Sequence, residues 1–538
     1  MRDPASGGAP ASGAVTRALR SARWRSVIPS QGLGAILTGA SPRAAGWMHP
    51  CRPSPRSGFG PAEGEYKRFG AFRWNRRGRP LFYASMTSEY LVSRWVHSGV
   101  FRTAKGHVAM AVDTAGIYWE FMEERIGRIT EACTTCGKCF EACPMPVYAE
   151  FDGSDSESVT RGVIDIINGR AGAPDAVRWV EICQKSGVCI EACPEDVNPR
   201  EMISYAKIKR LNAAGDGEST KKVSRDYFKL LSRTIRLMAG LQVEPDLYKR
   251  LIAVHGQKKA KADAVFYFGC NILQTPHILL SCMDVFDRMN LDYEVAGGMG
   301  HCCGINHIRR GDLETGAAMG KRSLDLFKSY GAESVITFCP TCQMQYTDYI
   351  HLYAGPEGDS LPFIHISKYL AERIEMLKSL YVHPVEKRVA VHLHGGLEGV
   401  EDNVQAILRS VPGLELVDID QLSDHGYQCP TLVVPEAREV MRAKLFTSAE
   451  AAGVDSIVTI YHGCHRALCG EELNHPVEIE NFMTILGQAM GFEYPDRTKT
   501  FKLYEDMDRV LAEAGEMLRA NGVDPDKARE QLQQALYP

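Results

Sequence analysis

Five cysteines in the middle of the chain limit what it can fold into more than any other feature. They form three patterns, in chain order a lone Cys270, the run Cys302-Cys303-Gly304 and the run Cys339-Pro340-Thr341-Cys342. Two neighbouring thiolates can both bind one metal cluster. The glycine that follows lets the backbone turn tightly around the cluster, because glycine has no Cβ. The alternative is a set of buried structural thiols, since a free cysteine packs like a small hydrophobe. Three different cysteine patterns in series favour the metal cluster.

Bulk composition narrows the class of protein. A chain of 538 residues is long enough for two or more domains, and its net charge of −4 argues against nucleic acid as the main partner. No apolar run reaches the length of about 18 residues that a transmembrane helix needs, so no such segment is expected. The 17 cysteines stand largely in CxxC and CCG groups, and we find no signal peptide with an apolar core. This pattern favours metal ligation in a reducing cytoplasm over disulfides.

Residues 1–85 differ in composition from the rest of the chain. They carry 13 Arg and one Lys against three acidic residues, with Gly, Ala, Ser and Pro between them. Such a stretch cannot bury enough apolar surface to order itself. Three interpretations are open: a basic tail, a targeting peptide, or a start site assigned too early, with Met86 or Met48 as the true beginning. We favour the last, because Met86 opens the first segment of ordinary composition.

The rest of the chain is expected to combine helical and mixed parts. Residues 87–260 predict an all-α ferredoxin-type domain around two cysteine groups. Between 261 and 495, short apolar runs alternate with helical segments, which predicts an α/β cysteine-rich domain. Strands are expected there at 264–268, 334–337, 362–366, 388–393, 414–419 and 455–460. Residues 496–538 predict a polar, amphipathic helical tail that covers a surface or meets a partner.

An internal repeat predicts that the α/β domain is a duplicated unit. Four segments of the first copy match four of the second: 265–270 with 390–395, 301–304 with 427–430, 338–343 with 460–465, and 366–370 with 479–483. The spacing is alike, because 31 residues separate the first two cysteine positions of the first copy and 32 separate the corresponding positions of the second. In the second copy, three of the five cysteine positions hold Gly395, Gln428 and Tyr461, and two keep Cys429 and Cys464.

Upstream, Cys133, Cys136, Cys139 and Cys143 follow the spacing of a bacterial ferredoxin, with a proline after the last. Thiolates two residues apart surround three corners of a cubane [4Fe–4S] cluster, and the cysteine before proline reaches the other cluster of a two-cluster fold. A zinc site is the alternative for CxxC pairs. Four cysteines at this spacing with a trailing proline favour iron and sulfide.

A second run, at 183–194, departs from this rule, because Ser186 stands where a second cysteine is expected. Crossed ligation gives one complete set and one incomplete set. The complete set is Cys133, Cys136, Cys139 and Cys193, and the incomplete set is Cys143, Cys183 and Cys189 with Ser186 or water. Three thiolates suit a [3Fe–4S] cluster. A [4Fe–4S] cluster with serine or water at the fourth iron, and a decayed site that binds nothing, are the alternatives.

Together these motifs resemble the heterodisulfide reductase C and B subunits, fused in that order, over roughly residues 120–490. They are also similar to the iron–sulfur subunits of glycolate oxidase and anaerobic glycerol-3-phosphate dehydrogenase. The resemblance implies that electrons pass through ferredoxin clusters to a noncubane cluster with Cys302 and Cys303 at its reactive centre. It implies five ligands for that cluster: Cys270, Cys302, Cys303, Cys339 and Cys342. The heterodisulfide reductase B subunit has two such five-cysteine sites. The cysteines missing from the second copy in this chain therefore argue against disulfide cleavage by two clusters.

The remains of the second site have three interpretations. Cys429 and Cys464 stand near several histidines in the repeat, and such a collection can bind Zn²⁺. The candidate ligands are Cys429, Cys464, His392 and His465. Alternatively, these residues are a remnant, or they line a substrate pocket beside the intact cluster.

The chain carries no flavin or nicotinamide fingerprint, so another protein must supply or receive its electrons. We expect a cytoplasmic oxidoreductase subunit that relays electrons between a flavoprotein, or another redox subunit, and a thiol/disulfide couple at the noncubane cluster. The alternative is a non-catalytic electron-transfer subunit of a membrane-associated dehydrogenase, peripheral to the membrane, that passes electrons toward quinone. The missing second site favours this alternative somewhat, because a lone cluster carries one electron at a time.

Overall fold

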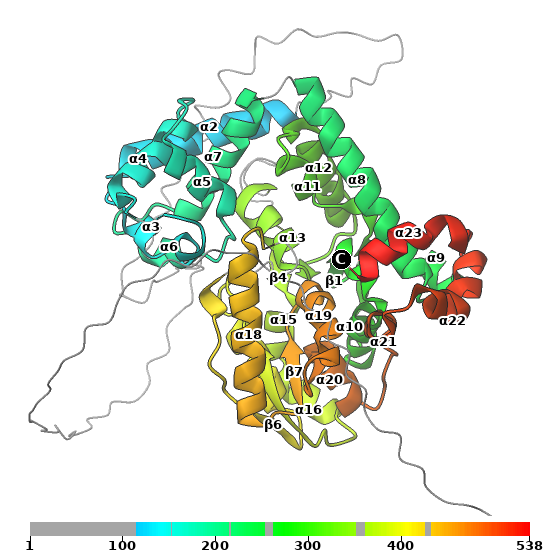
Figure 1. Ribbon diagram of the computed structural model, residues 1–538. Helices are drawn as coiled ribbons and strands as arrows, with labels where there is room; N and C mark the ends of the chain where they lie inside the picture. The colour runs from blue at the N-terminus through cyan, green and yellow to red at the C-terminus, as the bar shows by residue number, and fades with distance from the viewer. Residues whose placement is uncertain are drawn as a thin grey trace, which may run out of the picture. The chain divides into compact units, whose positions relative to one another are not determined.

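The computed structural model describes residues 114–151, 153–214, 217–252, 262–350, 361–425 and 432–537. The basic segment at 1–85 lies outside these residues, and so does Cys429. The described chain combines helices with two small parallel sheets (Figure 1). Among the described residues, no helix has the length and apolar character needed to cross a membrane.

Helices make up the described chain before the first sheet. They are α2 (Thr114–Ala132), α3 (Lys138–Glu141), η2 (Pro146–Tyr148), α4 (Ser156–Ile167), α5 (Pro174–Ile182), α6 (Val188–Glu191), α7 (Pro199–Ala214), α8 (Gly217–Gly240) and α9 (Pro245–Ile252). The Asp155 carboxylate caps α4 by accepting a hydrogen bond from the Ser158 N–H at 2.9 Å. Val159, Val163 and Ile166 recur at helical spacing and are buried. Burying each such side chain stabilises the fold by about 1.5–3 kcal/mol.

The first sheet has four parallel strands in the order β2-β1-β3-β4. The strands are β1 (Ala264–Gly269), β2 (Tyr293–Gly297), β3 (Ser334–Thr337) and β4 (Phe363–His365). Every residue of the central strand β1 is buried, as expected for a parallel strand covered on both faces. The chain leaves β1 for β2 on one side and returns to β3 on the other, so β1 and β3 flank a topological switch point. Ligands of open parallel sheets bind outside the carboxyl ends of the strands at such a point.

Helices and turns connect these strands. They are η3 (Asn271–Gln274), α10 (Pro276–Arg288), η4 (Met299–His301), α11 (Ile305–Ile308), α12 (Leu313–Ser329), α13 (Pro340–Met344), η5 (Gln345–Ile350), α15 (Ile366–Ala371) and α16 (Ile374–Leu380). α12 also packs against α2, which joins the first sheet to the helices that precede it.

The second sheet has the same strand order as the first, β6-β5-β7-β8, and all its strands are parallel. Its strands are β5 (Lys387–His392), β6 (Leu414–Leu416), β7 (Ser456–Thr459) and β8 (Glu478–Asn481). The connecting elements are α17 (Val400–Arg409), η6 (Ser423–His425), α18 (Pro435–Ala452), α19 (His462–Leu468) and η8 (Cys469–Leu473), with α20 (Phe482–Ala489) after β8.

Each of the six expected strands overlaps an observed one, and two strands, β2 and β8, were not expected. The match of 366–370 with 479–483 is wrong by three residues. Ile366 begins α15, whereas Ile479 lies inside β8. His365 pairs with Thr337 and Asn481 pairs with Thr459 in the equivalent strands. Ile366 therefore corresponds to Phe482, which begins α20.

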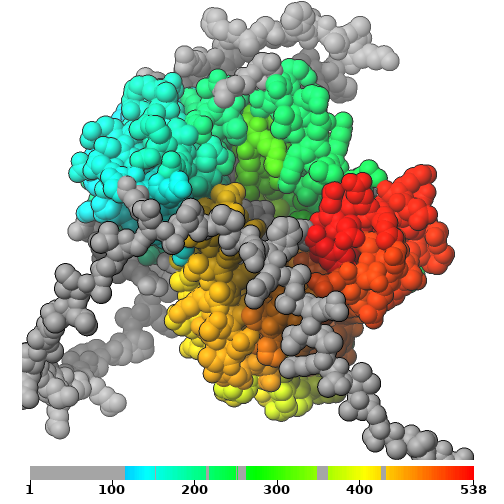
Figure 2. Space-filling view, in the orientation of Figure 1, coloured from blue at the N-terminus to red at the C-terminus, as the bar shows by residue number. Residues whose placement is uncertain are grey.

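Three helices, α21 (Arg497–Tyr504), α22 (Met507–Ala520) and α23 (Pro525–Leu536), end the chain. They pack against the end of α8, as the space-filling view also shows (Figure 2). Gln531 donates a hydrogen bond to Thr234 Oγ1 of α8 at 2.7 Å. This group has its own core, which includes Leu237, Met238, Leu241, Phe501, Val510, Leu518 and Leu532. The helical tail therefore covers one end of α8.

Candidate iron–sulfur sites

The five cysteines of the first sheet leave the carboxyl ends of three neighbouring strands. Cys270 follows β1, Cys302 and Cys303 follow β2 through η4, and Cys339 and Cys342 follow β3. All are buried except Cys339, which is half-buried. Because parallel strands end at one edge of a sheet, segments far apart in the sequence bring their thiols to one place, beside the switch point.

The five thiols form one connected array. Cys270 and Cys303 donate hydrogen bonds to the sulfur of Cys302, so the pKa of Cys302 lies well below its ordinary value. Cys342 donates to Cys339 and to Cys303, and the first of these bonds lowers the pKa of Cys339. The pKa values of the three donors are raised, because each donates to a neighbouring sulfur and is buried.

Glycines allow the loops that carry these cysteines to approach closely. At Gly304 φ is +81°, and a Cβ there would lie 2.0 Å from the carbonyl oxygen of Gly316 in the first turn of α12. At Gly269 φ is +77°, and a Cβ would lie 3.1 Å from the sulfur of Cys342. The Gly298 N–H donates to the Gly269 carbonyl oxygen at 2.6 Å, which joins the loops after β1 and β2. The glycine of the CCG run therefore lets α12 pack directly onto the cysteine loop.

A buried polar contact from α8 braces the helix that follows the CCG run. Ser224 Oγ lies 2.7 Å from Nδ1 of His307, and Asp312 Oδ2 lies 3.4 Å from the same nitrogen. The Phe228 ring packs against the imidazole at 4.7 Å between centroids. Burial lowers the pKa of His307. Helix α8 thereby fixes α11 beside the cysteines.

This donor set fits an iron–sulfur cluster. Thiolates are soft ligands that select zinc, Cu(I) or iron–sulfur clusters. Five thiols in one array exceed the four ligands of a tetrahedral zinc site. No side chain could be added at Gly269 without approaching Cys342, so the site is shaped around sulfur atoms.

The four cysteines of the complete ferredoxin set line one cavity of about 320 Å³. Cys133, Cys136 and Cys139 come from the first run and Cys193 comes from the second. The structure therefore brings together the four residues that crossed ligation predicts. Thr160 lines the same cavity, with Oγ1 3.8 Å from the sulfur of Cys139. Burial raises the pKa of Cys139 to about 11.

The second run repeats the backbone shape of the first. Thr135 and Lys185 both have positive φ, at 57° and 59°, and the glycine two residues later in each run has φ of 79° and 93°. The short helices α3 and α6 begin directly after these glycines. Ser186 therefore occupies the loop position that Cys136 has in the first run.

The three thiols of the incomplete set lie close enough to affect one another. Burial, with a smaller contribution from the nearby Cys183, raises the pKa of Cys143 to about 11. Burial also raises the pKa of Cys189, with Cys183 and Cys143 as the next causes.

The ferredoxin-like helices contact the second sheet beside this incomplete set. Arg200 Nη1 donates to the Gly396 carbonyl oxygen at 2.9 Å, and Tyr148 OH lies 2.9 Å from Nε2 of His425. The Ser186 carbonyl oxygen would lie 3.5 Å from a Cβ on Gly395. Gly395, at the position matched to Cys270, thus faces Ser186, at the position matched to Cys136.

Histidines and one tyrosine line the second sheet where cysteines line the first. His392 ends β5, and its ring lies 5.8 Å from that of His394. The His394 ring meets that of Tyr461 edge-on at 5.3 Å. Glu401 accepts a hydrogen bond from the His394 N–H, and burial raises the pKa of Glu401. These groups are polar and aromatic, so this region is built differently from the thiol array.

The structure describes three of the four predicted zinc ligands, and one of these three has another partner. Cys429 lies outside the described residues, and His392 and Cys464 are buried. The Nε2 of His465 lies 2.6 Å from Oδ2 of Asp496, so this histidine has a partner outside the predicted group. A zinc site with these four ligands stays a prediction.

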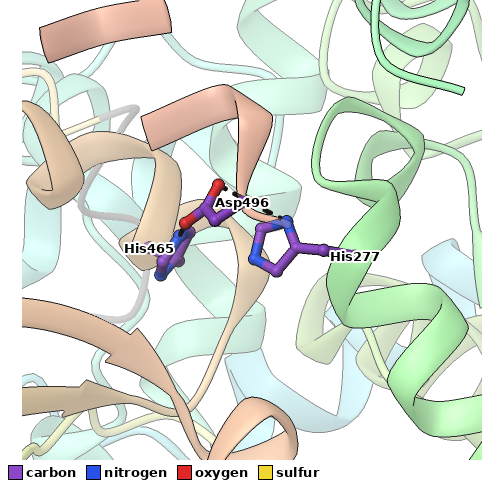
Figure 3. A group of neighbouring side chains, drawn as sticks. All are labelled: His277, His465 and Asp496. Atoms are coloured by element: carbon purple, nitrogen blue, oxygen red, sulfur yellow. Dashed lines mark hydrogen bonds and ion pairs between the residues drawn. The ribbon is translucent and has the colours of Figure 1, made fainter. Parts of the chain in front are cut away.

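Sequence analysis did not single out His277 and Asp496, which lie against His465 (Figure 3). Nδ1 of His277 is 3.5 Å from Oδ1 of Asp496. No spacing motif connects the three residues, which lie in α10, in α19 and directly before α21. Only the fold brings them together.

Models of known protein families match two segments of the chain. A model described as a 4Fe-4S dicluster domain matches residues 129–197, which hold the seven cysteines of the two ferredoxin-like runs. A model described as a cysteine-rich domain matches residues 264–347, which hold the five cysteines of the first sheet. The chain carries an iron–sulfur dicluster domain and a cysteine-rich domain.

Two curated relatives extend this result. The D subunit of the dihydromethanophenazine:CoB–CoM heterodisulfide reductase of Methanosarcina barkeri is 24% identical over 253 residues, which are 43% of this chain and 60% of that protein. The B subunit of the fumarate reductase (CoM/CoB) of Methanothermobacter marburgensis is 27% identical over 343 residues, which are 62% of this chain and 55% of that protein. The chain resembles heterodisulfide reductase-like iron–sulfur proteins. The match spans less than two thirds of the length of either relative.

Among solved structures, a hypothetical protein from Helicobacter pylori aligns with 71% of this chain and 77% of its own length. The TM-score is 0.39 and the identity is 12%, which is too low to support an argument about the fold.

Proposed function

We propose that the chain relays electrons between a flavoprotein partner and the five-cysteine site, through the two ferredoxin-type sites. A disulfide is reduced at the five-cysteine site when electrons arrive there, and a thiol pair is oxidised when electrons leave it. Reduction takes two electrons and two protons, cleaves the S–S bond and yields two thiols. The partner supplies the electrons, and solvent supplies the protons. Bound iron–sulfur clusters supply the one-electron chemistry. The chain's own residues hold the clusters in place, bury them and set the order of the sites.

The observation that carries this proposal is the connected thiol array. Cys302 and Cys303 lie at its centre, because Cys303 contacts both Cys302 and Cys342. Both are 1% exposed, so the loops around them exclude water. We therefore assign the reactive centre to this pair. The names of both curated relatives contain the pair CoM and CoB, and one of them names a heterodisulfide. These names support a thiol/disulfide couple as the substrate class.

A viologen assay tests this function. The full chain, reconstituted with iron and sulfide under anaerobic conditions, should oxidise reduced viologen when a disulfide from a panel is added. Two electrons should be consumed for each disulfide cleaved, and no oxidation should occur without disulfide. If no disulfide is turned over while the spectra of all clusters are intact, disulfide reduction is ruled out.

The second candidate is a non-catalytic electron-transfer subunit of a membrane-associated dehydrogenase that passes electrons toward quinone. The structure of the second sheet favours it, because Gly395 and Tyr461 take places where thiols would stand and only one full array is present among the described residues. We infer from the equal strand orders that the two sheets are copies of one unit, and that the second has exchanged its cluster ligands for other groups. This candidate predicts reduction of a quinone analogue in the presence of a dehydrogenase partner, and no disulfide turnover.

We also propose that Ser186 faces the second ferredoxin-type cluster, because its loop has the shape of the loop that carries Cys136. In the Ser186→Cys variant, a fourth thiolate should convert a [3Fe–4S] EPR spectrum to that of a [4Fe–4S] cluster. If serine or water already completes a [4Fe–4S] cluster, the signal should keep its type and shift in potential. An unchanged spectrum and potential would show that Ser186 lies away from any cluster. Ser379→Cys, at an exposed position of α16, is a control for adding a thiol.

A further inference from the structure

Three side chains from separate parts of the fold converge beside the second sheet. His277 lies in the first turn of α10, His465 in α19, and Asp496 directly before α21. Their candidate ligand atoms all lie within 4.8 Å of one another, and the carboxylate lies between the two rings (Figure 3). We infer that these residues form a binding site for one Zn²⁺ ion. The inference does not depend on the proposed redox function.

The distances are close to those of a zinc site. Zinc bonds to imidazole nitrogen and carboxylate oxygen at about 2.0–2.2 Å, which places ligand atoms of a tetrahedral site about 3.4 Å apart. Nδ1 of His277 and Oδ1 of Asp496 are 3.5 Å apart. Nε2 of His465 and Oδ2 of Asp496 are 2.6 Å apart, a hydrogen-bond distance. Metal binding replaces the shared proton of that bond, and the proton leaves to solvent.

The two imidazoles have nitrogen atoms that the surrounding protein does not satisfy. The side chains of His277 and His465 are 2% and 1% exposed. Both nitrogens of His277 and Nδ1 of His465 are buried and make no hydrogen bond within the described residues. Buried polar groups in proteins are nearly always hydrogen-bonded, so an unsatisfied one needs an explanation. A metal ion bound to Nδ1 of His277 provides the explanation for that atom.

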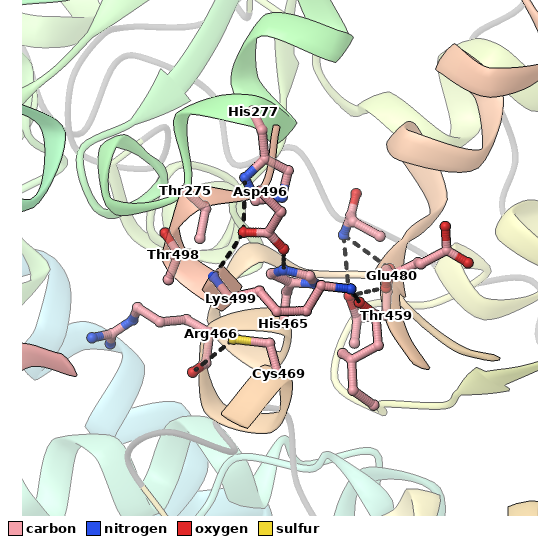
Figure 4. Close-up of polar contacts among 12 residues, drawn as sticks. Thr275, His277, Thr459, His465, Arg466, Cys469, Glu480, Asp496, Thr498 and Lys499 are labelled. Atoms are coloured by element: carbon pink, nitrogen blue, oxygen red, sulfur yellow. Dashed lines mark hydrogen bonds and ion pairs between the residues drawn. The ribbon is translucent and has the colours of Figure 1, made fainter. Parts of the chain in front are cut away.

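Nearby charges are compatible with a cation in this place. The ammonium group of Lys499 lies 3.1 Å from Glu472 and 3.2 Å from Glu478, so its charge is already balanced. Oδ1 of Asp496 accepts a hydrogen bond from the Lys499 N–H at 3.0 Å and caps α21 (Figure 4). A carboxylate oxygen has two lone pairs, so this cap leaves one for a metal ion.

The donor set indicates the metal and its role. Two imidazoles and one carboxylate are a typical protein ligand set for Zn²⁺, with water at the fourth position. Two of the three elements, α19 and α21, also hold the loop that follows Cys270. Arg466 donates to Gln274 Oε1 at 3.2 Å, and Thr498 donates to the Gln274 carbonyl oxygen at 2.7 Å. A bound ion would therefore cross-link α10, α19 and α21 and brace this loop.

Metal analysis tests the site. The full chain with its iron–sulfur clusters is incubated with zinc sulfate, passed through a desalting column and analysed for zinc and iron. Wild type should retain about one zinc ion per chain at this site. Asp496→Asn should lower the retained zinc by more than about tenfold, since loss of even an outer-shell partner weakens metal sites about 10–100-fold. Asparagine is also a good helix cap, so α21 should still form.

Asp524→Asn is the matched control, because Asp524 caps α23 in the same way and lies far from the two histidines in sequence and contacts. It should retain as much zinc as wild type, and iron should be equal in all three proteins. His277→Gln gives a second test that leaves the cap intact.

X-ray absorption at the zinc edge of wild type provides a test without any variant. The first shell should consist of nitrogen and oxygen at about 2.0–2.1 Å, whereas zinc in a cysteine site would show sulfur at about 2.3 Å. The inference is overturned if wild type retains no zinc, if Asp496→Asn and His277→Gln retain as much as wild type, or if the shell contains sulfur.

Discussion

Replacing Cys303 with alanine should abolish the spectrum of the five-cysteine cluster and leave the ferredoxin-type signals as they are in wild type. The sulfur of Cys303 contacts those of Cys302 and Cys342, so it joins the loop after β2 to the loop after β3. Without it the hydrogen-bonded link between these two loops is lost. The ferredoxin-type sites draw their cysteines from 133–193 and share none with this array.

The effect on activity should be large. Loss of an outer-shell partner weakens a metal site about 10–100-fold, and loss of a ligand should exceed that range. Disulfide turnover in the viologen assay should fall by more than about 100-fold if the proposed function is correct. Anaerobic EPR, iron analysis and the assay are carried out on the same preparation.

Cys282→Ala is the matched control for this variant. Cys282 is fully buried in α10, close in sequence to Cys270, and is hydrogen-bonded to no cysteine of the array. It should cost some packing energy but no iron, and all cluster signals should persist. If disulfide turnover survives in Cys303→Ala, the terminal site lies elsewhere in the chain.

The sequence predicted most of the strands because their apolar residues stand in short continuous runs. β2 and β8 were missed for a physical reason. Both lie at the edge of a four-stranded sheet, where one side has no neighbouring strand, and their sequences mix polar and apolar residues. In β8, Glu480 is buried but forms an ion pair with Lys387 of β5, at 2.8 Å. That partner is far away in the sequence, so the local pattern does not indicate a buried strand.

Cysteine positions could be predicted because the clusters that they suit require short, fixed spacings, and the structure groups these thiols as the spacing implies. The grouping of His277 and Asp496 with His465 could not be predicted, because these residues meet only through the packing of three helices. The same limit explains the facing positions of Ser186 and Gly395. Each departure from a cysteine pattern is visible by itself in the sequence, but only the fold shows that the two are neighbours. We conclude that they belong to one contact between the ferredoxin-like helices and the second sheet.

Gly304→Ala should disrupt the cysteine loop more than any other single-methyl substitution in the first sheet's loops. A Cβ at residue 304 would lie 2.0 Å from the backbone oxygen of Gly316 and 2.7 Å from its carbonyl carbon, so neither neighbour is a flexible side chain that could move aside. The backbone at 304 also has φ of +81°, which disfavours a residue with a Cβ by about 1–2 kcal/mol. Overpacking adds about 1–3 kcal/mol. We expect destabilisation by about 2–5 kcal/mol together with loss of the cluster held by Cys302 and Cys303.

Gly331→Ala separates the two contributions. Gly331, between α12 and β3, also has a positive φ, +63°, but a Cβ there would meet nothing within 4 Å. Its substitution should therefore show only the backbone cost of about 1–2 kcal/mol and keep the cluster. Chemical denaturation under anaerobic conditions measures both variants, and EPR of the same samples shows whether the cluster is bound. Equal destabilisation of the two would mean that φ alone governs position 304. A larger loss in Gly304→Ala, with the cluster absent, would mean that the CCG glycine is required because α12 packs against the backbone at that point.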